Sequence, residues 1–394
     1  MVETSSIGMN SWHYDFSLLP EYLKVFFTKL RIAVVFGGDC NKPGSVIYKT
    51  HNPRAWKSYE VVAKEIATSL KEVGFKQVFL MPDDLNLPDK LKAENIHLVW
   101  LNTGGVQGYN PVCHTPALLE MLGMPYIGHN PLNSSILDNK HAFKRELQSV
   151  GFKTAPFIIW HPSQGIFKPK LQDRFALAFG DYSGPFIVKP VSGRASLHVH
   201  FVETIDGLSQ AVSAVHLATH NTALIEKYLP GREFCVAVCG YVTHAQGSFY
   251  KQHKPFAFST IERVLESDEL IFTSMDKKTI TPDRGKLIGP EEPQLKQELI
   301  ELAQKIYWEF SLNSLVRIDV RCDEHGELYV LEANPKPDLK RPAENVTSLV
   351  ALGLAEYNMT YNDLILSLIA DRLDYLLRKD IGIISHIVDL LHFS

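Results

Sequence analysis

The sequence predicts an α/β protein with a parallel sheet near its N-terminus and two later lobes that mix helices with antiparallel strands. Three observations predict this class. Short apolar runs alternate with amphipathic helices from residue 29 to about 130, strands joined by small residues follow, and two alternating strands flank a turn at 323–326. A chain of 394 residues suits several packed units, because domains typically hold about 100–200 residues.

Residues 29–130 show the order strand, helix, strand that builds a parallel sheet. The runs RIAVVFGGD, QVFLMP, IHLVWLNTGG and MPYIGH predict four strands. SYEVVAKEIATSLKEVG repeats apolar residues at helical spacing and ends at Gly74, and CHTPALLEMLG predicts a second helix. Loops after parallel strands meet at one edge of the sheet, so we expect them to face a ligand.

From residue 131 the pattern becomes antiparallel. Helix SILDNKHAFKRELQSVG is followed by strand FIIWHP, two strands within PFIVKPVSGRASLHVHFV, helix GLSQAVSAVHLAT, and strands ALIEKYL and REFCVAVCGY. Residues 250–290 lack a long periodic element, which predicts long loops that serve as a lid. We expect four parts: an N-terminal extension (1–28), an N-terminal α/β substrate domain (29–130), a central lobe (131–250), and a C-terminal lobe with lid and metal site (251–394).

The composition excludes several classes of function. A formal net charge of −4 gives no overall attraction to nucleic acid, so any phosphate group must be bound locally. The five cysteines form no close metal-binding pair, and with no export signal at the start we expect reduced thiols in the cytoplasm. No run of about 18 apolar residues occurs, which argues against a membrane span.

The most informative stretch is SLVRIDVRCDEHGELYVLEANP, which follows the helix predicted in PQLKQELIELAQKIYWEF. Two alternating strands around a turn-rich tetrapeptide predict a β-hairpin. If the turn is centred between residues 325 and 326, Asp319 faces Glu332 and Arg317 faces Asn334. All four side chains then share one face, because side chains two residues apart point the same way.

That face has the side chains of a magnesium site. Magnesium takes a few carboxylate or carbonyl oxygens and completes its shell with water and nucleotide phosphates, which suits Asp319, Glu332 and Asn334. Arg317 has only donors and could neutralise charge on a carbonyl or phosphoryl oxygen. Lys189 ends an apolar strand beside small residues, where a cation and backbone amides could meet phosphates. The spacing leaves open a plain exposed hairpin of ion pairs.

Five short motifs, taken in order, resemble the ATP-grasp superfamily and particularly the D-alanine–D-alanine ligase group. They are LDNK, FIVKP, LIEKYLPGREF, VRIDV and LYVLEANPKP, and the resemblance covers roughly residues 29–370. The resemblance implies an ATP-grasp fold in which an N-terminal parallel α/β domain precedes two α+β lobes that sandwich ATP. It also implies an ADP-forming ligase that joins a carboxylate to an amine through an acyl phosphate.

The resemblance also implies roles for individual residues on the nucleotide. Lys140 and Lys189 match the lysines that contact the phosphates. Glu226 would accept from the adenine amino group, the backbone of Lys227 to Leu229 would line the adenine, and Glu233 would bind the ribose hydroxyls.

The hairpin residues match the family's metal and catalytic positions. Asp319, Glu332 and Asn334 match the magnesium-binding set, which implies two Mg²⁺ ions with Mn²⁺ as a substitute. Arg317 matches the residue that stabilises the tetrahedral intermediate. Catalysis of this kind rests on positioning and charge neutralisation.

The positions that correspond to the family's substrate-binding residues depart from the family pattern. Arg194, Ala195 and Ser196 stand where the family has a glycine and paired serines, and Asp338-Leu339-Lys340 replaces a glycine-methionine-threonine stretch. The loop after the first strand runs CNKPGSVIYKTHNPRAW in place of an acidic anchor, and 102–105 replace a histidine-glycine pair. These changes argue against dipeptide synthesis for a cell wall.

We therefore expect the enzyme to attach an amino acid to a small-molecule acid or cyclic acceptor in specialised metabolism. A subgroup of similar ligases that acts on mycosporine-glycine is one candidate. The alternatives are a D-alanine–D-alanine ligase, a non-catalytic ATP-binding regulatory protein, and a carboxylase- or kinase-like member. Because related ligases often form dimers, a homodimer is also an expectation.

Overall fold

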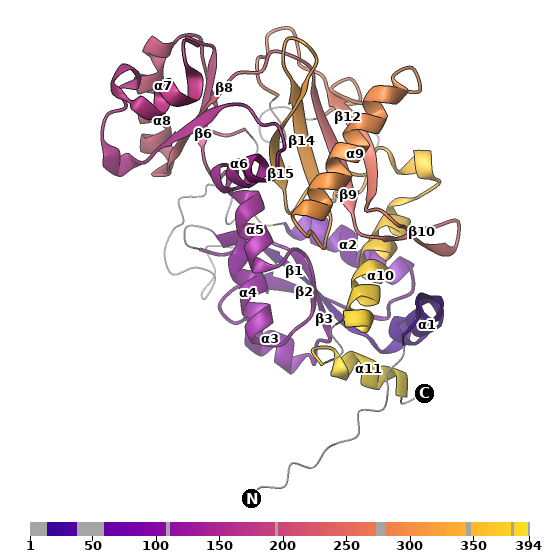
Figure 1. Cartoon of the computed structure of the whole chain (residues 1–394). Helices are drawn as coiled ribbons and strands as arrows, with labels where there is room; N and C mark the ends of the chain where they lie inside the picture. The colour runs from indigo at the N-terminus through magenta and orange to yellow at the C-terminus, as the bar shows by residue number, and fades with distance from the viewer. Residues whose placement is uncertain are drawn as a thin grey trace, which may run out of the picture.

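The structure is a computed structural model that describes residues 14–37, 59–107, 111–193, 196–272, 280–343, 348–379 and 382–392. The segment 40–56, Arg194 and Ala195, which the sequence comparison singled out, lie outside the described residues. Figure 1 shows a parallel sheet with α3 and α4 in the lower part of the view, a small lobe with α7 and α8 above it on one side, and a larger lobe with α9 on the other.

The predicted parallel unit is confirmed. Strands β1 (Arg31–Gly37), β2 (Gln77–Asp83), β3 (Leu98–Asn102) and β4 (Tyr126–Ile127) pair in the order β2-β1-β3-β4, and every pair is parallel. The connecting and flanking helices are α1 (Leu19–Lys29), α2 (Glu60–Glu72), α3 (Leu87–Ala93) and α4 (His114–Met121). Both faces of β1 are buried, which explains its uninterrupted apolar run.

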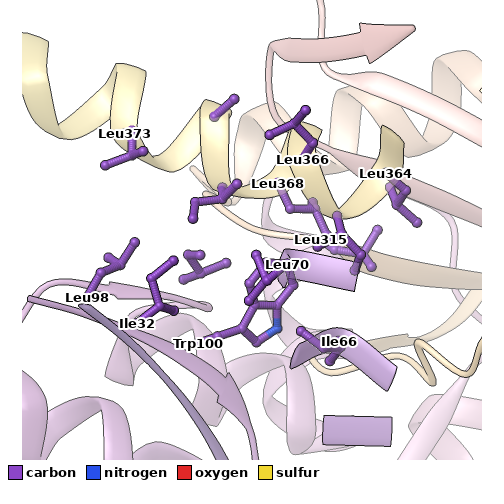
Figure 2. Packing of buried hydrophobic residues seen from close by; sticks show 14 of the residues in the cluster. Ile32, Ile66, Leu70, Leu98, Trp100, Leu315, Leu364, Leu366, Leu368 and Leu373 are labelled. Carbon is purple, nitrogen blue, oxygen red and sulfur yellow. The ribbon is translucent and has the colours of Figure 1, made fainter. Parts of the chain in front are cut away.

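The C-terminal helix α10 (Tyr361–Lys379) returns to cover the N-terminal sheet. Figure 2 shows Leu364 and Leu373 of α10 above Ile32, Leu98 and Trp100 of the sheet, with α2 side chains in the same cluster. The shorter α11 (Ser385–His392) lies against α1. Among the described residues, no helix combines the length and apolar character needed to cross a bilayer.

The small lobe is a four-stranded antiparallel sheet covered by two helices. Strands β5 (Phe157–Trp160), β6 (Phe186–Pro190), β7 (His200–Val202) and β8 (Ala223–Lys227) pair in the order β5-β8-β6-β7. The helices are α7 (Asp173–Phe179) and α8 (Leu208–Thr219). The sequence had predicted this lobe as antiparallel, and the strand pairing confirms it.

The helix expected over 135–151 is interrupted. It is the end of α5 (Pro131–Asp138) followed by α6 (Lys140–Ser149), and Asn139 separates the two. The Asn139 side chain accepts a hydrogen bond of 3.0 Å from the Ala142 backbone N–H, which makes it the N-cap of α6. This break places Lys140 in the first turn of α6, where its backbone N–H donates to the carbonyl of Val191, the residue that follows β6.

The larger lobe holds a five-stranded sheet in the order β13-β12-β9-β14-β15. Its strands are β9 (Glu233–Cys239), β12 (Phe256–Arg263), β13 (Gly285–Leu287), β14 (Val316–Cys322) and β15 (Leu328–Asn334). Helix α9 (Pro293–Glu309) packs on one face, and the hairpin β10 (Val242–Ala245) and β11 (Ser248–Lys251) contacts α10.

Two features of this sheet differ from what the sequence indicated. Strand β9 was placed with the central lobe, but it pairs with β12 and β14 of the larger sheet. Strand β12 lies in the stretch interpreted as long loops; a bulge between Phe258 and Ile261, with Ser259 at φ +50°, breaks its period-two alternation. The five-stranded sheet therefore begins at residue 233, well before residue 251.

A buried carboxyl group lies at the end of β2. Asp83 accepts hydrogen bonds from the hydroxyls of Thr103 (2.6 Å) and Thr115 (2.7 Å), which fastens the edge of the parallel sheet to α4. Burial raises the pKa of Asp83 to about 6, although the two hydroxyls oppose the shift. The folded protein thus holds a proton between about pH 4 and pH 6 that the unfolded chain has lost.

We expect the Asp83→Asn variant to change the pH dependence of stability. Because the folded-state pKa is raised, the wild-type free energy of unfolding should fall by about 2 kcal/mol, relative to the variant, as pH rises from about 4 to 7. Urea unfolding of both proteins at pH 4 and pH 7.5 measures this difference. Asp89→Asn, an exposed carboxyl in the same domain, is the control. An equal pH dependence in wild type and Asp83→Asn would contradict the assignment.

Candidate active site

A cavity lies between the small lobe and the five-stranded sheet, with about 800 Å³ of empty space that includes its opening to solvent. Its walls come from the start of α6, from β6 and β8 of the small lobe, and from β9, β12, β14 and β15 of the larger lobe. Seven of the ten residues predicted from the sequence line it: Lys140, Lys189, Glu226, Lys227, Leu229, Glu233 and Glu332. The other three, Arg317, Asp319 and Asn334, lie on the adjoining hairpin.

Glu226 is buried between two lysines. Its carboxylate forms an ion pair of 3.0 Å with Lys144 and another with Lys189, and all three side chains are shielded from water. Burial alone would raise the pKa of Glu226, but the two ammonium groups outweigh it and hold the pKa below the usual range. Lys189 therefore lies beside Glu226, the predicted adenine acceptor, as well as lining the cavity.

A second ion pair joins α6 to β15. The Lys140 ammonium lies 3.1 Å from a carboxylate oxygen of Glu332 and donates to the backbone carbonyl of Gly193 at 3.2 Å. Burial opposes ionisation of Glu332, but Lys140 and Lys189 lower its pKa to about 2. The carboxylate is therefore ionised near neutral pH, with the Lys140 ammonium in direct contact.

The hairpin pairing predicted from the sequence is confirmed, although the turn is centred elsewhere. Arg317 pairs with Asn334 and Asp319 with Glu332, whereas beyond a bulge Val320 pairs with Val330. The turn is thus symmetric about residue 325, and the bulge at Leu331 restores the predicted register at the site.

Asp319 is completely buried and surrounded by donors. Arg317 binds it with two hydrogen bonds of 2.7 and 2.9 Å, and the Asn334 side-chain amide donates to it at 3.3 Å. Arg263 of β12 adds a contact of 2.9 Å to the same oxygen, Oδ2, that Asn334 approaches. Two guanidinium groups and one amide therefore surround the single carboxylate of Asp319.

Glu233 also has two guanidinium partners. Arg263 approaches it at 2.9 Å and Arg321 at 3.2 Å. Arg321 further donates to the Tyr228 hydroxyl at 2.9 Å and lies over that ring. The cavity wall near Glu233 thus contains two buried arginines that the sequence reasoning had not assigned.

Sequence reasoning missed three residues of the site: Lys144, Arg263 and Arg321. Lys144 follows Lys140 by one helical turn, and that spacing could have placed it on the same face. Arg321 alternates with Arg317 and Asp319 along β14, so the strand period could also have found it. Arg263 had no usable signal, because the bulge in β12 hides the strand that carries it.

The residues present can accommodate a divalent metal ion. Two carboxylates and one amide face the same side of a hairpin, and magnesium would take further ligands from phosphates and water. The part of the chain that the structure describes has no group of three or more His, Cys, Asp or Glu able to hold a metal ion. The donor set therefore suits a metal ion that arrives with a nucleotide better than a permanently bound one.

An N-terminal parallel α/β domain and two antiparallel lobes that enclose a cationic cavity form the ATP-grasp fold. The chain belongs to the family described as D-ala D-ala ligase C-terminus, whose model matches residues 147–370. It is thus a D-Ala–D-Ala ligase-like enzyme.

Solved structures share the fold. The D-alanine–D-alanine ligase of Bacillus anthracis complexed with ATP superposes with a TM-score of 0.63 at 20% identity, covering 88% of this chain and 98% of that one. A second structure of the same ligase gives a TM-score of 0.61 at 22% identity, with the same coverage.

Sequence relatives divide into two kinds. An uncharacterized protein, y4sG, of Sinorhizobium fredii is 26% identical over 338 residues, which is 82% of this chain and 93% of that protein. The D-alanine–D-alanine ligase of Streptomyces avermitilis is 28% identical over 248 residues, only 59% of this chain and 60% of that ligase. The match to this named ligase is therefore partial, whereas the match to the uncharacterized relative spans most of both chains.

Proposed function

We propose that this enzyme uses MgATP to join an amino acid to a small-molecule acceptor that carries a carboxyl group or an enolic ring oxygen. The observation that carries the proposal is the cavity, where seven residues of the predicted nucleotide and metal set line one space. The acceptor belongs to specialised metabolism, and mycosporine-glycine is our leading candidate for it.

The polar residues of the cavity support the binding of ATP. Glu226 would accept from the adenine amino group, and the buried Leu229 and the adjoining backbone would cover the purine. Glu233 would bind the ribose hydroxyls, and Lys140 would contact the phosphates. The contact between Lys189 and Glu226 favours a place for Lys189 where the purine meets the phosphates.

The β14–β15 hairpin carries the residues proposed for the reaction itself. Glu332, Asp319 and Asn334 would hold two Mg²⁺ ions, or Mn²⁺ in their place, which neutralise phosphate charge. The acceptor oxygen attacks the γ-phosphorus, the bond to the β–γ bridging oxygen breaks, and ADP leaves. The amine then attacks the activated carbon, phosphate leaves, and the amine releases a proton. Arg317 would donate to the oxygen that becomes negative in this step.

The residues at the positions of the family's substrate-binding residues support an acceptor other than D-alanine. Asn102 and Thr103, which stand where the family has a histidine-glycine pair, are buried; the Asn102 amide donates to the Tyr59 carbonyl at 3.0 Å. Leu339 is also buried, and its carbonyl accepts from the Tyr361 hydroxyl at 2.7 Å. These replacements are thus built into the packing of β3 against the start of α2, and of the segment after β15 against α10, which supports a reshaped substrate site.

Three expectations from the sequence remain part of the proposal. We propose an N-terminal extension, an N-terminal substrate domain and two nucleotide-binding lobes, with the boundary between the lobes moved to about residue 230 because β9 pairs in the larger sheet. We also propose that the enzyme is a cytoplasmic homodimer. It would bind small molecules and neither nucleic acid nor a membrane.

The test is a phosphate-release screen of amino acids paired with acceptor acids and cyclic enols, followed by mass measurement of each conjugate. We expect phosphate release that needs both substrates and a product whose mass equals their sum less one water. A D-alanyl-D-alanine product would instead establish the dipeptide ligase. ATP binding without turnover in any pair would support the regulatory alternative, and a stable phosphorylated acceptor would indicate a kinase.

A further inference from the structure

The segment that follows β15 places a lysine beside the N-terminal sheet. Lys336 comes two residues after Asn334, the last residue of β15, and its ammonium lies 3.1 Å from the centre of the Tyr59 ring. The negative face of an aromatic ring attracts a cation, so this contact fixes where the charge lies. Lys336 does not line the cavity proposed for ATP, and no step of the proposed reaction uses it.

Tyr59 lies where the N-terminal sheet offers a binding site. It directly precedes α2, the helix that follows β1, and its carbonyl accepts the 3.0 Å hydrogen bond from Asn102, the last residue of β3. The strand order β2-β1-β3-β4 puts β2 and β3 on opposite sides of β1. In open α/β sheets, ligands bind at the carboxyl ends of the strands where the order reverses in this way. Lys336 therefore reaches the expected ligand crevice from the end of the proposed metal-binding hairpin.

The stretch that carries Lys336 is fastened to two helices. The Leu339 carbonyl accepts from the Tyr361 hydroxyl of α10 at 2.7 Å, and the Arg341 backbone N–H donates to Glu65 of α2 at 2.8 Å. These contacts hold the chain between β15 and α10, so the lysine is positioned before a ligand arrives. Binding to a positioned side chain loses less conformational entropy than binding to a mobile one.

The sequence between β1 and Tyr59 is basic. In the stretch 40–58 there are four lysine or arginine residues and no aspartate or glutamate, whereas the family pattern has an acidic anchor in this loop. The four are Lys42, Lys49, Arg54 and Lys57. Together with Lys336, this charge favours an anionic ligand group at the crevice, and the anion that an acid acceptor carries is a carboxylate.

We propose that Lys336 is a specificity-determining residue that binds a second carboxylate of the acceptor, remote from the oxygen that is phosphorylated. The proposal rests on the proposed function, because it takes the joining reaction to occur beside the β14–β15 hairpin. The reacting oxygen must lie at the hairpin, so the other end of the acceptor extends toward the sheet and Lys336. This narrows the acceptor to acids and cyclic enols that carry one further carboxylate, which does not react.

The test compares acids that differ only in the second carboxylate. Succinate, glutarate and cis-cyclohexane-1,3-dicarboxylate, each beside its monoamide, are titrated into the full-length protein saturated with Mg²⁺ and a non-hydrolysable ATP analogue, and calorimetry measures binding. Wild type should bind at least one diacid about tenfold tighter than its monoamide, the effect of one charge-assisted hydrogen bond. In Lys336→Met this preference should disappear, with binding of the monoamide unchanged. The proposal is wrong if wild type binds every diacid and monoamide equally, or if the preference survives in the variant.

Two further variants serve as controls. Lys64 of α2 pairs with Glu60 at 2.7 Å, and both side chains are exposed, so Lys64→Met removes one positive charge from the same helix without removing the lysine at Tyr59. It should keep the preference for the diacid. Lys336→Arg should keep it as well, because the charge remains. If Lys336→Met weakens binding of the ATP analogue itself, Lys336 acts on the nucleotide and the proposal is overturned.

Kinetics separate this proposal from the proposed function. Where a preferred diacid and an amine release phosphate, Lys336→Met should raise KM for the diacid by about tenfold and leave KM for ATP unchanged. A Lys336-dependent preference for diacids without phosphate release from any amine would contradict the ligase reaction but keep the carboxylate site. Equal KM values for a diacid and its monoamide in wild type would keep the ligase and contradict the carboxylate site.

Discussion

Replacing Glu332 with alanine should lower amine-dependent phosphate release from MgATP by about a thousandfold, the loss seen when a group that stabilises transition-state charge is removed. Glu332 is the member of the proposed metal set that lines the cavity, so it is the ligand a metal–nucleotide complex meets first. Its removal also frees Lys140 from a 3.1 Å ion pair. Steady-state rates across a range of Mg²⁺ concentrations measure the loss, and added Mg²⁺ should not restore the rate.

The matched control is Glu327→Ala on the same hairpin. Glu327 has a side chain 45% exposed and pairs with Lys153 away from the cavity, so its loss should leave the rate unchanged. The pKa of Glu332 is about 2, so this carboxylate stays ionised above about pH 4. We therefore expect that protonation of Glu332 does not cause any fall in the wild-type rate that is measured above about pH 4. Parent-level turnover by Glu332→Ala would remove Glu332 from the metal site.

The sequence predicted the parts of the site that depend on local pattern. Alternation along β14 and β15 and the turn between them were enough to pair Arg317 with Asn334 and Asp319 with Glu332. The parallel sheet was also predictable, because each strand is a compact apolar run bounded by a helix or a glycine. These features are encoded within about twenty residues, where side-chain period and turn chemistry decide the structure.

The remaining features depend on contacts between distant segments. No local pattern shows that Arg263 of β12 reaches Asp319 of β14, or that Lys144 and Lys189 share Glu226. The pairing of β9 with the larger sheet was missed for the same reason, since its alternation fits either neighbouring sheet. Partner choice in a sheet depends on which faces are buried together, and this is a tertiary property.

The Glu226→Met variant should reduce the free energy of unfolding by about 3–5 kcal/mol. Glu226 is the carboxylate that compensates two buried ammonium groups, at 3.0 Å from Lys144 and in contact with Lys189. Its loss leaves both without that partner, and an uncompensated buried charge is among the most destabilising changes a core can suffer. Lys189 retains the more distant attraction of Glu332, so the larger share of the cost should fall on Lys144.

Lys144→Met should be far less costly, at most about 1–2 kcal/mol, because Glu226 then keeps Lys189 as a one-to-one partner. Burial already lowers the pKa of Lys144, so its charged form is the less favourable of the two cations. Methionine has a similar length and suits this dry site, while the Thr154 hydroxyl keeps its 2.8 Å bond to the Val330 carbonyl.

The double variant Lys144→Met/Glu226→Met completes the argument. It leaves one ammonium group without its partner rather than two, so it should cost less than the sum of the single variants, with a coupling of about 1–3 kcal/mol. Chemical unfolding of the four proteins at pH 7 gives this coupling. If Lys144→Met costs as much as Glu226→Met, the charge imbalance of the cluster does not control its stability. A separate variant, Glu226→Gln, tests whether Glu226 also recognises adenine. If this variant folds but binds the ATP analogue more weakly than wild type, Glu226 contributes to adenine recognition as well as to stability.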